Sequence, residues 1–499
     1  MINAPMRLRQ RITWAGVLAS LYMLGIVATA WMRLDVSWDS LAYHLPFAGI
    51  RGGIITYADY IIPAAHRILL EGFPPVLDFV KGMLWRMTGH VEATQLFNTI
   101  VVVGGAVAMT KLYEIRIAAA ILAVLAVPVA QVEFAGNYTD LPVNFLLAFG
   151  MFSIVHVLVS PERHQIRHAI VTACVLCIAT TFKVTAIPFG IVIWCVYVVT
   201  AGFQRDSVHA NALSDLRKQN FPRFLGLAVL GGAVAIGYGW VNLVAMGNPL
   251  FPVALQIGPL SLPGAVSTSS WAPAAYLADV PRTLRWLVSV FEWRAFDLRP
   301  LPYIVAQGDV PSTAMSYRMG GLFAYQLMFT VCLLFTIRIK LGGGLIFKLA
   351  AVHAMMALVV SIVPGSHEMR YFFFWYLSFL WAAFYVIEQR LQDKIMSQVF
   401  VASLAVSALY ITAITGARYV YPFSDMPDSE DLARSGIGTE VKSHLDAGVR
   451  SFCVVDKDPY GILYSRPFHE RLGRKIDYQV SADIMSPACQ TMQQPEELK

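Results

Sequence analysis

Acidic side chains follow the ends of long apolar runs, where they could take part in proton transfer. Asp39, in the stretch WDSLAYHLPF, comes directly after the first run. A carboxylate fixed at the mouth of a membrane span can act as general base for an acceptor hydroxyl, although Asp39 could also cap the helix that SLAYHLPF predicts. Asp140 opens a later run, and Glu133 precedes it on the same face. These acids could orient a sugar or share a divalent metal ion, and capping is again the simpler role for Asp140.

A second set of candidates is basic. The stretch PGSHEMRYFFFW places His367, Glu368 and Arg370 in a turn directly before an aromatic run. Arginine binds phosphate in a bidentate manner, and a helix N-terminus offers backbone N–H groups. Lys183, inside another apolar stretch, would add a point charge. We expect Lys183, Arg370 and His367 to hold a lipid phosphate as a leaving group; a cap and a snorkelling arginine would explain the turn without a ligand.

The remaining polar residues separate by side of the expected membrane. Outer loops collect acids and histidines, whereas inner loops carry mainly Lys and Arg. Ionisable groups that gather at one face, at membrane depth, are typical of a functional site. We therefore expect further substrate contacts from His44, Glu71, Glu133 and Glu368.

Composition identifies the class of protein that positions these residues. The 499-residue chain is 57% hydrophobic and 14% charged, with a mean hydropathy of +0.57, whereas soluble domains carry about 25% charge. This composition predicts an all-α polytopic membrane protein. The net charge of +6 comes from short Lys and Arg clusters between apolar runs. This pattern is typical of cytoplasmic loops of a membrane protein, and no basic face predicts a nucleic-acid partner.

Apolar runs predict about eleven membrane-spanning helices. Arg7, Arg9 and Arg11 before the first run predict a cytoplasmic N-terminus; a cleaved signal peptide is the alternative. Basic residues on both sides of the stretch 169–203 require it to cross and return, so Lys183 lies near an outer turn. The expected spans lie near 12–32, 95–110, 117–133, 141–159, 169–203 (two), 224–246, 320–337, 345–363, 371–388 and 396–416.

Three longer hydrophilic pieces all fall on the outer face. The loop 34–92 predicts two interfacial helices, one with Leu77, Val80, Leu84 and Met87 opposite Lys81 and Arg86. The loop 247–319 predicts another around Thr283 to Phe296. The tail has a small α/β character, with SFCVVD as a strand and YGILYS as a weaker one, and its two cysteines, Cys453 and Cys489, could form a disulfide. We divide the chain into a transmembrane domain (1–417) and a C-terminal domain (418–499).

Five motifs in order, DSLAYHLP, GFPP, YTDLP, GNPLFP and HEMRYFFF, resemble the bacterial GT-C membrane glycosyltransferases over residues 10–420. Relatives in that superfamily include the protein O-mannosyltransferases and the lipid A aminoarabinose transferase. The resemblance implies a periplasmic active site in the inner membrane and a polyprenyl-phosphate sugar donor. Asp39 looks like the first-loop catalytic acid and Asp140 like the second, while Lys183 and Arg370 are placed like donor-phosphate contacts. The chain lacks the paired Asp-Glu of the O-mannosyltransferase first loop, so protein mannosylation is not implied.

Two other classes stay open on the sequence. An O-antigen-type polymerase or ligase would use Arg and His in a late outer loop, and a transporter would line a path with the same charges. Transporters usually carry internal repeats, which the sequence lacks. No P-loop or Rossmann glycine pattern predicts a nucleotide cofactor. The sequence does not identify the sugar, the acceptor (glycan, lipid or protein), the lipid length or any metal dependence.

Overall fold

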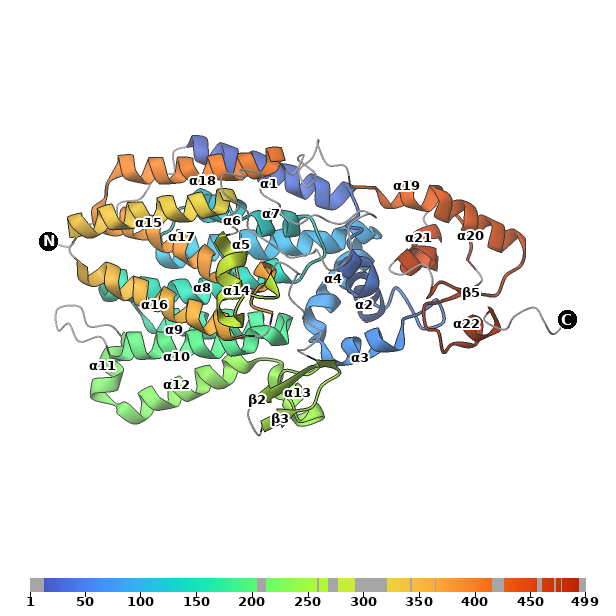
Figure 1. The fold of residues 1–499 in the computed structure, drawn as a ribbon, viewed down its shortest axis with the longest axis horizontal. Helices are drawn as coiled ribbons and strands as arrows, with labels where there is room; N and C mark the ends of the chain where they lie inside the picture. Colours follow the sequence, from blue (N-terminus) through green and yellow to red (C-terminus); the bar gives the residue numbers. More distant parts are fainter. Residues whose placement is uncertain are drawn as a thin grey trace.

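The computed structural model describes residues 13–203, 212–257, 260–267, 277–291, 321–341, 343–363, 365–414, 426–455, 460–470, 473–476 and 478–492. Long helices run side by side through most of the molecule, and a smaller body of short helices and strands lies beyond one end of them (Figure 1).

The long helices match the apolar runs of the sequence. Within the described ranges, six helical segments are long and apolar enough to cross a membrane, or up to eight if each of two bent pairs is one span. This supports a multi-pass helical membrane protein; the expected count of eleven and the orientation stay predictions. The helices are α1 (Trp14–Met32), α5 (Leu96–Tyr113), α6 (Ile117–Leu125), α7 (Pro128–Phe134), α8 (Asp140–Val159), α9 (Ile166–Phe182), α10 (Ile187–Gly202), α11 (Ala212–Gln219), α12 (Phe221–Ile236), α13 (Gly239–Met246), α15 (Gly321–Leu341), α16 (Gly343–Ile362), α17 (Phe374–Val386) and α18 (Lys394–Ile414).

Helix α8 lies at the centre of the bundle. Every residue of it except Leu158 is buried, and it packs against α5, α9, α10 and α17. Gly150 allows α9 to approach closely, because a Cβ there would lie 2.6 Å from the Leu176 side chain. Because α8 begins at Asp140, this packing fixes the position of the Asp140 backbone.

The first loop and the tail form the smaller body together. The loop contributes α2 (Leu45–Arg51), α3 (Ala64–Gly72), α4 (Pro75–Thr88) and strand β1 (Tyr60–Ile61). The tail contributes α19 (Ser429–Arg434), α20 (Gly436–Asp446), α21 (Arg466–Glu470), α22 (Pro487–Met492), β5 (Ser451–Cys453) and β6 (Gln479–Ser481). The strands form one parallel sheet in the order β1-β6-β5, so the tail strand β6 lies between a loop strand and a tail strand.

Side chains from the loop and the tail also share a hydrophobic core, to which Leu41 and Leu45 contribute from the loop and Phe452 and Ile462 from the tail. The predicted domain boundary at 418 lies outside the described residues and stays a prediction. The strand predicted in SFCVVD is confirmed by β5. The one predicted in YGILYS is wrong, because Tyr460–Tyr464 is a 3-10 helix that buries Ile462 and Leu463 in this core.

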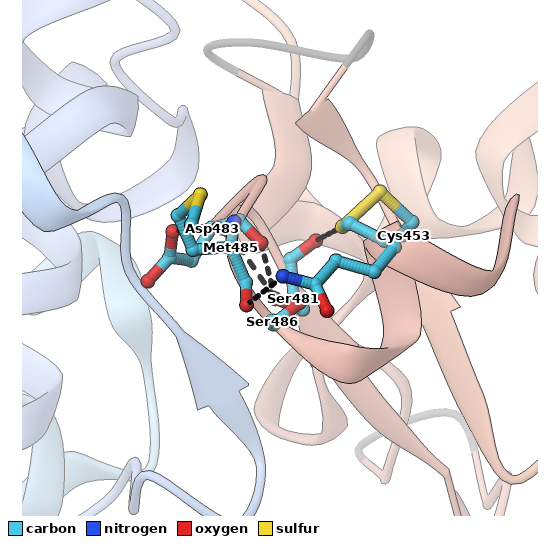
Figure 2. The surroundings of a disulfide bond; sticks show 7 residues. Cys453, Ser481, Asp483, Met485 and Ser486 are labelled. Carbon is cyan, nitrogen blue, oxygen red and sulfur yellow. Dashed lines mark hydrogen bonds between the residues drawn. A yellow bond between two sulfur atoms is a disulfide. The ribbon is translucent and has the colours of Figure 1, made fainter. Parts of the chain in front are cut away.

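The two tail cysteines are joined. Cys453 and Cys489 form a disulfide that links β5 to α22. Figure 2 shows this bond beside the turn after β6, where Ser481 and Ser486 are hydrogen-bonded through their hydroxyls at 2.6 Å. The predicted possibility of a disulfide is therefore confirmed. The bond links α22 to the sheet in which β6 pairs with β1.

The predicted polar face of α4 is wrong at one position. Lys81 is fully buried, whereas Met87, expected on the apolar face, is 77% exposed. The ammonium group of Lys81 donates to the carbonyl of Asn137 and lies near the carboxylates of Asp35 and Asp78. These charges compensate the burial of the lysine. Helix α4 therefore packs through a face that includes the charged side chains of Asp78 and Lys81.

The described part of the large loop contains a small sheet and a helix. A small sheet of β2 (Val253–Ile257), β3 (Leu260–Leu262) and β4 (Val266–Ser267) follows GNPLFP in the order β3-β2-β4. Buried Asn248 ties its ends together by donating to the carbonyls of Val253 and Pro263. The expected helix is confirmed as α14 (Arg282–Phe291), whereas its interfacial location stays a prediction; positions 292–296 lie outside the described residues.

Candidate active site

Asp39 and Arg370 form an ion pair at the end of the bundle that faces the smaller body. Asp39 precedes a π-helical turn, Ser40–His44, that continues directly into α2, and such turns are frequent at functional sites. Its side chain makes no capping bond within this segment; instead Asp39 Oδ2 accepts a hydrogen bond from Arg370 Nη1 at 2.5 Å. Capping therefore does not account for Asp39.

Asp140 and Lys183 form a second ion pair beside the first. Asp140 is the first residue of α8, and Lys183 directly follows the last residue of α9. The Lys183 ammonium group donates to Asp140 Oδ1 and lies 4.2 Å from the centre of the Tyr371 ring. Because the Tyr371 hydroxyl accepts from Arg370 Nη2 at 2.8 Å, this tyrosine joins the two ion pairs.

Buried amides fix the backbone that carries Asp140 and Arg370. Asn144 donates to the carbonyls of Asp140 and Arg370 and accepts from the Phe374 N–H, which ties the turn before α17 to α8. Asn98 donates to three carbonyls of the bend between α7 and α8. One member of each ion pair, Asp140 and Arg370, is thus mounted on the bundle, which favours precise positioning.

The turn that supplies Arg370 also supplies Glu368 and His367. Glu368 Oε2 lies 4.0 Å from Arg370 Nε, and His367 Nε2 lies 3.8 Å from Glu368 Oε1. Burial raises the pKa of Glu368 to about 7, against the opposing effect of Arg370. Burial lowers the pKa of His367, with a smaller contribution from Arg285. This turn therefore holds an acid that can change its charge near neutral pH.

The other predicted contacts differ in position. His44 is buried, and this burial holds its pKa well below the usual range. The positive charges of Lys81, Lys183 and Arg370 lower the pKa further, so the imidazole is neutral. Glu133 is buried near Asp140 and Arg370, and among the described residues nothing donates a hydrogen bond to either of its carboxylate oxygens. Glu71 lies on an exposed part of α3. The structure thus brings together all the predicted site residues except Glu71.

Two cavities meet at the ion pairs. The larger, of about 450 Å³, has a mainly apolar wall from α8, α10, α16 and β2, with Asp140, Lys183 and Arg282 among its lining residues. The smaller, of about 230 Å³, is lined by Asp39, His44 and several aromatic rings of the first loop. Lys183 and Tyr371 belong to both walls, so the charged groups lie where the two cavities adjoin.

Sequence reasoning missed several residues of these walls. Tyr371 and Asn144 could have been found, because Tyr371 follows Arg370 and Asn144 lies one turn after Asp140 in α8. Arg282 gives a weaker signal, since it only begins an amphipathic helix in the large loop. Its place in the cavity wall depends on how α14 packs against α16, which no local pattern predicts.

Among the described residues, no group of three or more His, Cys, Asp or Glu side chains is arranged to hold a metal ion. No family model, no curated protein and no solved structure matches this chain.

Proposed function

We propose that this protein is a membrane glycosyltransferase of the GT-C kind, which moves a sugar from a polyprenyl phosphate to an acceptor hydroxyl at the periplasmic face of the bacterial inner membrane. One observation carries the proposal: a larger and a smaller cavity adjoin at two carboxylate–cation pairs, at the end of a bundle of membrane-type helices. A lipid-linked donor and a hydroxyl acceptor need such a pair of compartments with charges at their junction.

The larger cavity suits the donor. Its apolar wall would take the first units of a polyprenyl chain, and Lys183 and Arg282 in the same wall would take the phosphate. Arg370 lies next to this wall through its bond to Tyr371. An arriving phosphate competes with Asp39 for the Arg370 guanidinium, so donor binding would free the carboxylate that serves as base.

In the proposed reaction Asp39 takes the proton of the acceptor hydroxyl as that oxygen attacks the anomeric carbon. The bond from the anomeric carbon to the phosphate oxygen breaks, and its electron pair leaves with the lipid phosphate. Lys183 and Arg370 neutralise the charge that develops there. Asp140 holds Lys183 in place, which makes it a positioning residue in this scheme.

Two features support the outer location of the site. The Lys- and Arg-rich loops lie at the far ends of the helices from Asp39 and Asp140. The disulfide between Cys453 and Cys489 lies in the body that carries Asp39, and disulfides persist in oxidising compartments.

The test uses purified protein in detergent with a panel of polyprenyl-phosphate sugars and a membrane extract as the acceptor source. Released polyprenyl phosphate is measured for wild type, Asp39→Asn and Glu71→Gln. We expect release from one donor, a loss of about 10²-fold or more in Asp39→Asn, and wild-type release in Glu71→Gln, whose side chain is exposed. Near-normal turnover in Asp39→Asn, with protein that elutes as a folded species, would refute the role of the base; no release from any donor would count against the reaction class.

A further inference from the structure

We infer that the smaller cavity binds a sugar ring of the acceptor, so that the acceptor is a carbohydrate. This inference rests on the proposed function, because it identifies the substrate class of the same site. The cavity combines aromatic rings, Trp38, Tyr43 and Phe73, with polar groups that include Asp39 and His44. A sugar ring has an apolar C–H face and a rim of hydroxyl groups, and this lining complements both.

The position of the base shows which cavity receives the acceptor. A general base must come within hydrogen-bonding distance of the hydroxyl that it deprotonates. Asp39 lines the smaller cavity, whereas the wall of the larger cavity contains Asp140 and Lys183 but not Asp39. The acceptor hydroxyl therefore enters the smaller cavity, and the rings around Asp39 contact the rest of the acceptor.

Trp38 is the exposed part of this lining. Half of its surface (50%) is accessible, and its ring stands at steep angles to those of Tyr43 and His66, at 6.3 and 5.9 Å between ring centres. These edge contacts fix the plane of the indole. Because Trp38 immediately precedes Asp39, a sugar stacked on the indole would present its hydroxyls to the carboxylate.

The size of the cavity and the polar groups placed in its wall argue for one ring rather than a lipid chain. Its volume of about 230 Å³ is half that of the apolar cavity beside it. Thr139 and Thr185 add hydroxyl groups to the wall, and His44, which is neutral, can either donate or accept. A sugar with several hydroxyls can use all of these groups, whereas a serine or threonine side chain of a protein acceptor would leave most of them unused.

The test measures binding without turnover. Saturation-transfer NMR on the purified full-length protein uses a panel of neutral mono- and disaccharides, with a Ser/Thr-containing tripeptide as the competing class. The variants are Trp38→Ala and Trp38→Phe. Trp31→Ala is the matched control, because Trp31 is 40% exposed and packs on His90 outside the cavity wall.

We expect saturation transfer to at least one sugar in wild type. Binding should weaken about tenfold in Trp38→Ala, as for loss of one aromatic contact, and should persist in Trp38→Phe and Trp31→Ala. Equal binding by Trp38→Ala, binding of the peptide alone, or no sugar binding would overturn the inference. Sugar binding without donor turnover would refute the transfer reaction alone, whereas donor turnover without sugar binding would refute the carbohydrate acceptor alone.

Turnover kinetics separate the two sugars of the reaction. If the acceptor occupies the cavity, Trp38→Ala raises the KM for the saccharide that binds and leaves the donor KM unchanged. A rise in the donor KM alone would mean that the ring belongs to the donor sugar, and this would overturn the inference.

Discussion

Replacing Glu368 by Gln should change how the stability of the protein depends on pH. Burial raises the pKa of Glu368 from its usual 4.5 to about 7 in the folded protein, although Arg370 opposes the rise. As the pH increases above 4.5, the unfolded chain loses this proton before the folded protein does. The folded state therefore loses stability between about pH 4.5 and pH 7, and no more above that range.

The size of the effect follows from the difference of about 2.5 in pKa. At about 1.4 kcal/mol per pKa unit, ionisation of Glu368 costs the folded state about 3 kcal/mol at pH 8. The glutamine side chain of the variant has nearly the same shape and cannot ionise. We expect Glu368→Gln to be more stable than wild type at pH 8 by up to this amount, and to differ from it by about 1 kcal/mol or less at pH 5.

The assay heats detergent-solubilised protein at pH 5, 6, 7 and 8 and measures the monodisperse fraction by size exclusion. Glu71→Gln is the matched control, because its exposed carboxylate should leave the pH profile of wild type unchanged. The unfolding midpoints of Glu368→Gln and wild type should diverge as the pH rises from 5 to 8. Parallel midpoints over the whole range would refute the reasoning that folded Glu368 retains its proton near pH 6.

Three further predictions concern other parts of the molecule. Arg282→Gln should raise the donor KM about tenfold, which corresponds to the loss of one partly solvated charge-assisted contact. Arg285→Gln is the control and should leave the donor KM unchanged, because Arg285 donates to the carbonyls of Val280 and Ala278, which lie outside the cavity walls. Equal effects of the two variants in donor titrations would refute the phosphate role of Arg282. Replacing Cys453 and Cys489 by Ser should destabilise the loop–tail body by about 4 kcal/mol, as expected for a bond that spans 36 residues. In limited proteolysis, the tail should be cleaved faster in this variant, and also in wild type after addition of reductant. Unchanged cleavage would contradict the prediction. Lys81→Met should cost about 3 to 5 kcal/mol, because it leaves the buried Asp35 carboxylate without its nearby cation; a thermal midpoint equal to that of wild type would show that this acid does not need it.

The residues that bear charge could be predicted because they interrupt apolar runs. Four of them lie at the ends of such runs, where a charged side chain marks a candidate site: Asp39, Asp140, Lys183 and Arg370. Their pairing could not be predicted, since Asp39 and Arg370 are 331 residues apart. Contacts over such distances depend on how the helices pack, and helical periodicity carries no information about them.

The smaller body shows a second reason for failure. Strand β1 has only two residues, Tyr60 and Ile61, so it leaves no alternating pattern for the sequence to reveal. The stretch YGILYS is apolar enough for a strand, but a short apolar run is compatible with a buried helical turn as well. Tertiary packing decided between the two, because this stretch lies against the π-helical turn Ser40–His44.

The sheet shared by the first loop and the tail imposes an order on biosynthesis. Arg466 and Asp59, which form an ion pair in this body, are separated by 407 residues. The ribosome completes β1 long before β6, so the loop that carries Asp39 waits for most of the chain before its sheet can form. Products of premature termination would contain the loop and the spans made before the break, yet lack the strand that pairs with β1. Formation of the sheet would thus coincide with translation as far as β6, and unfinished chains would expose an unpaired strand edge that quality-control proteases can recognise.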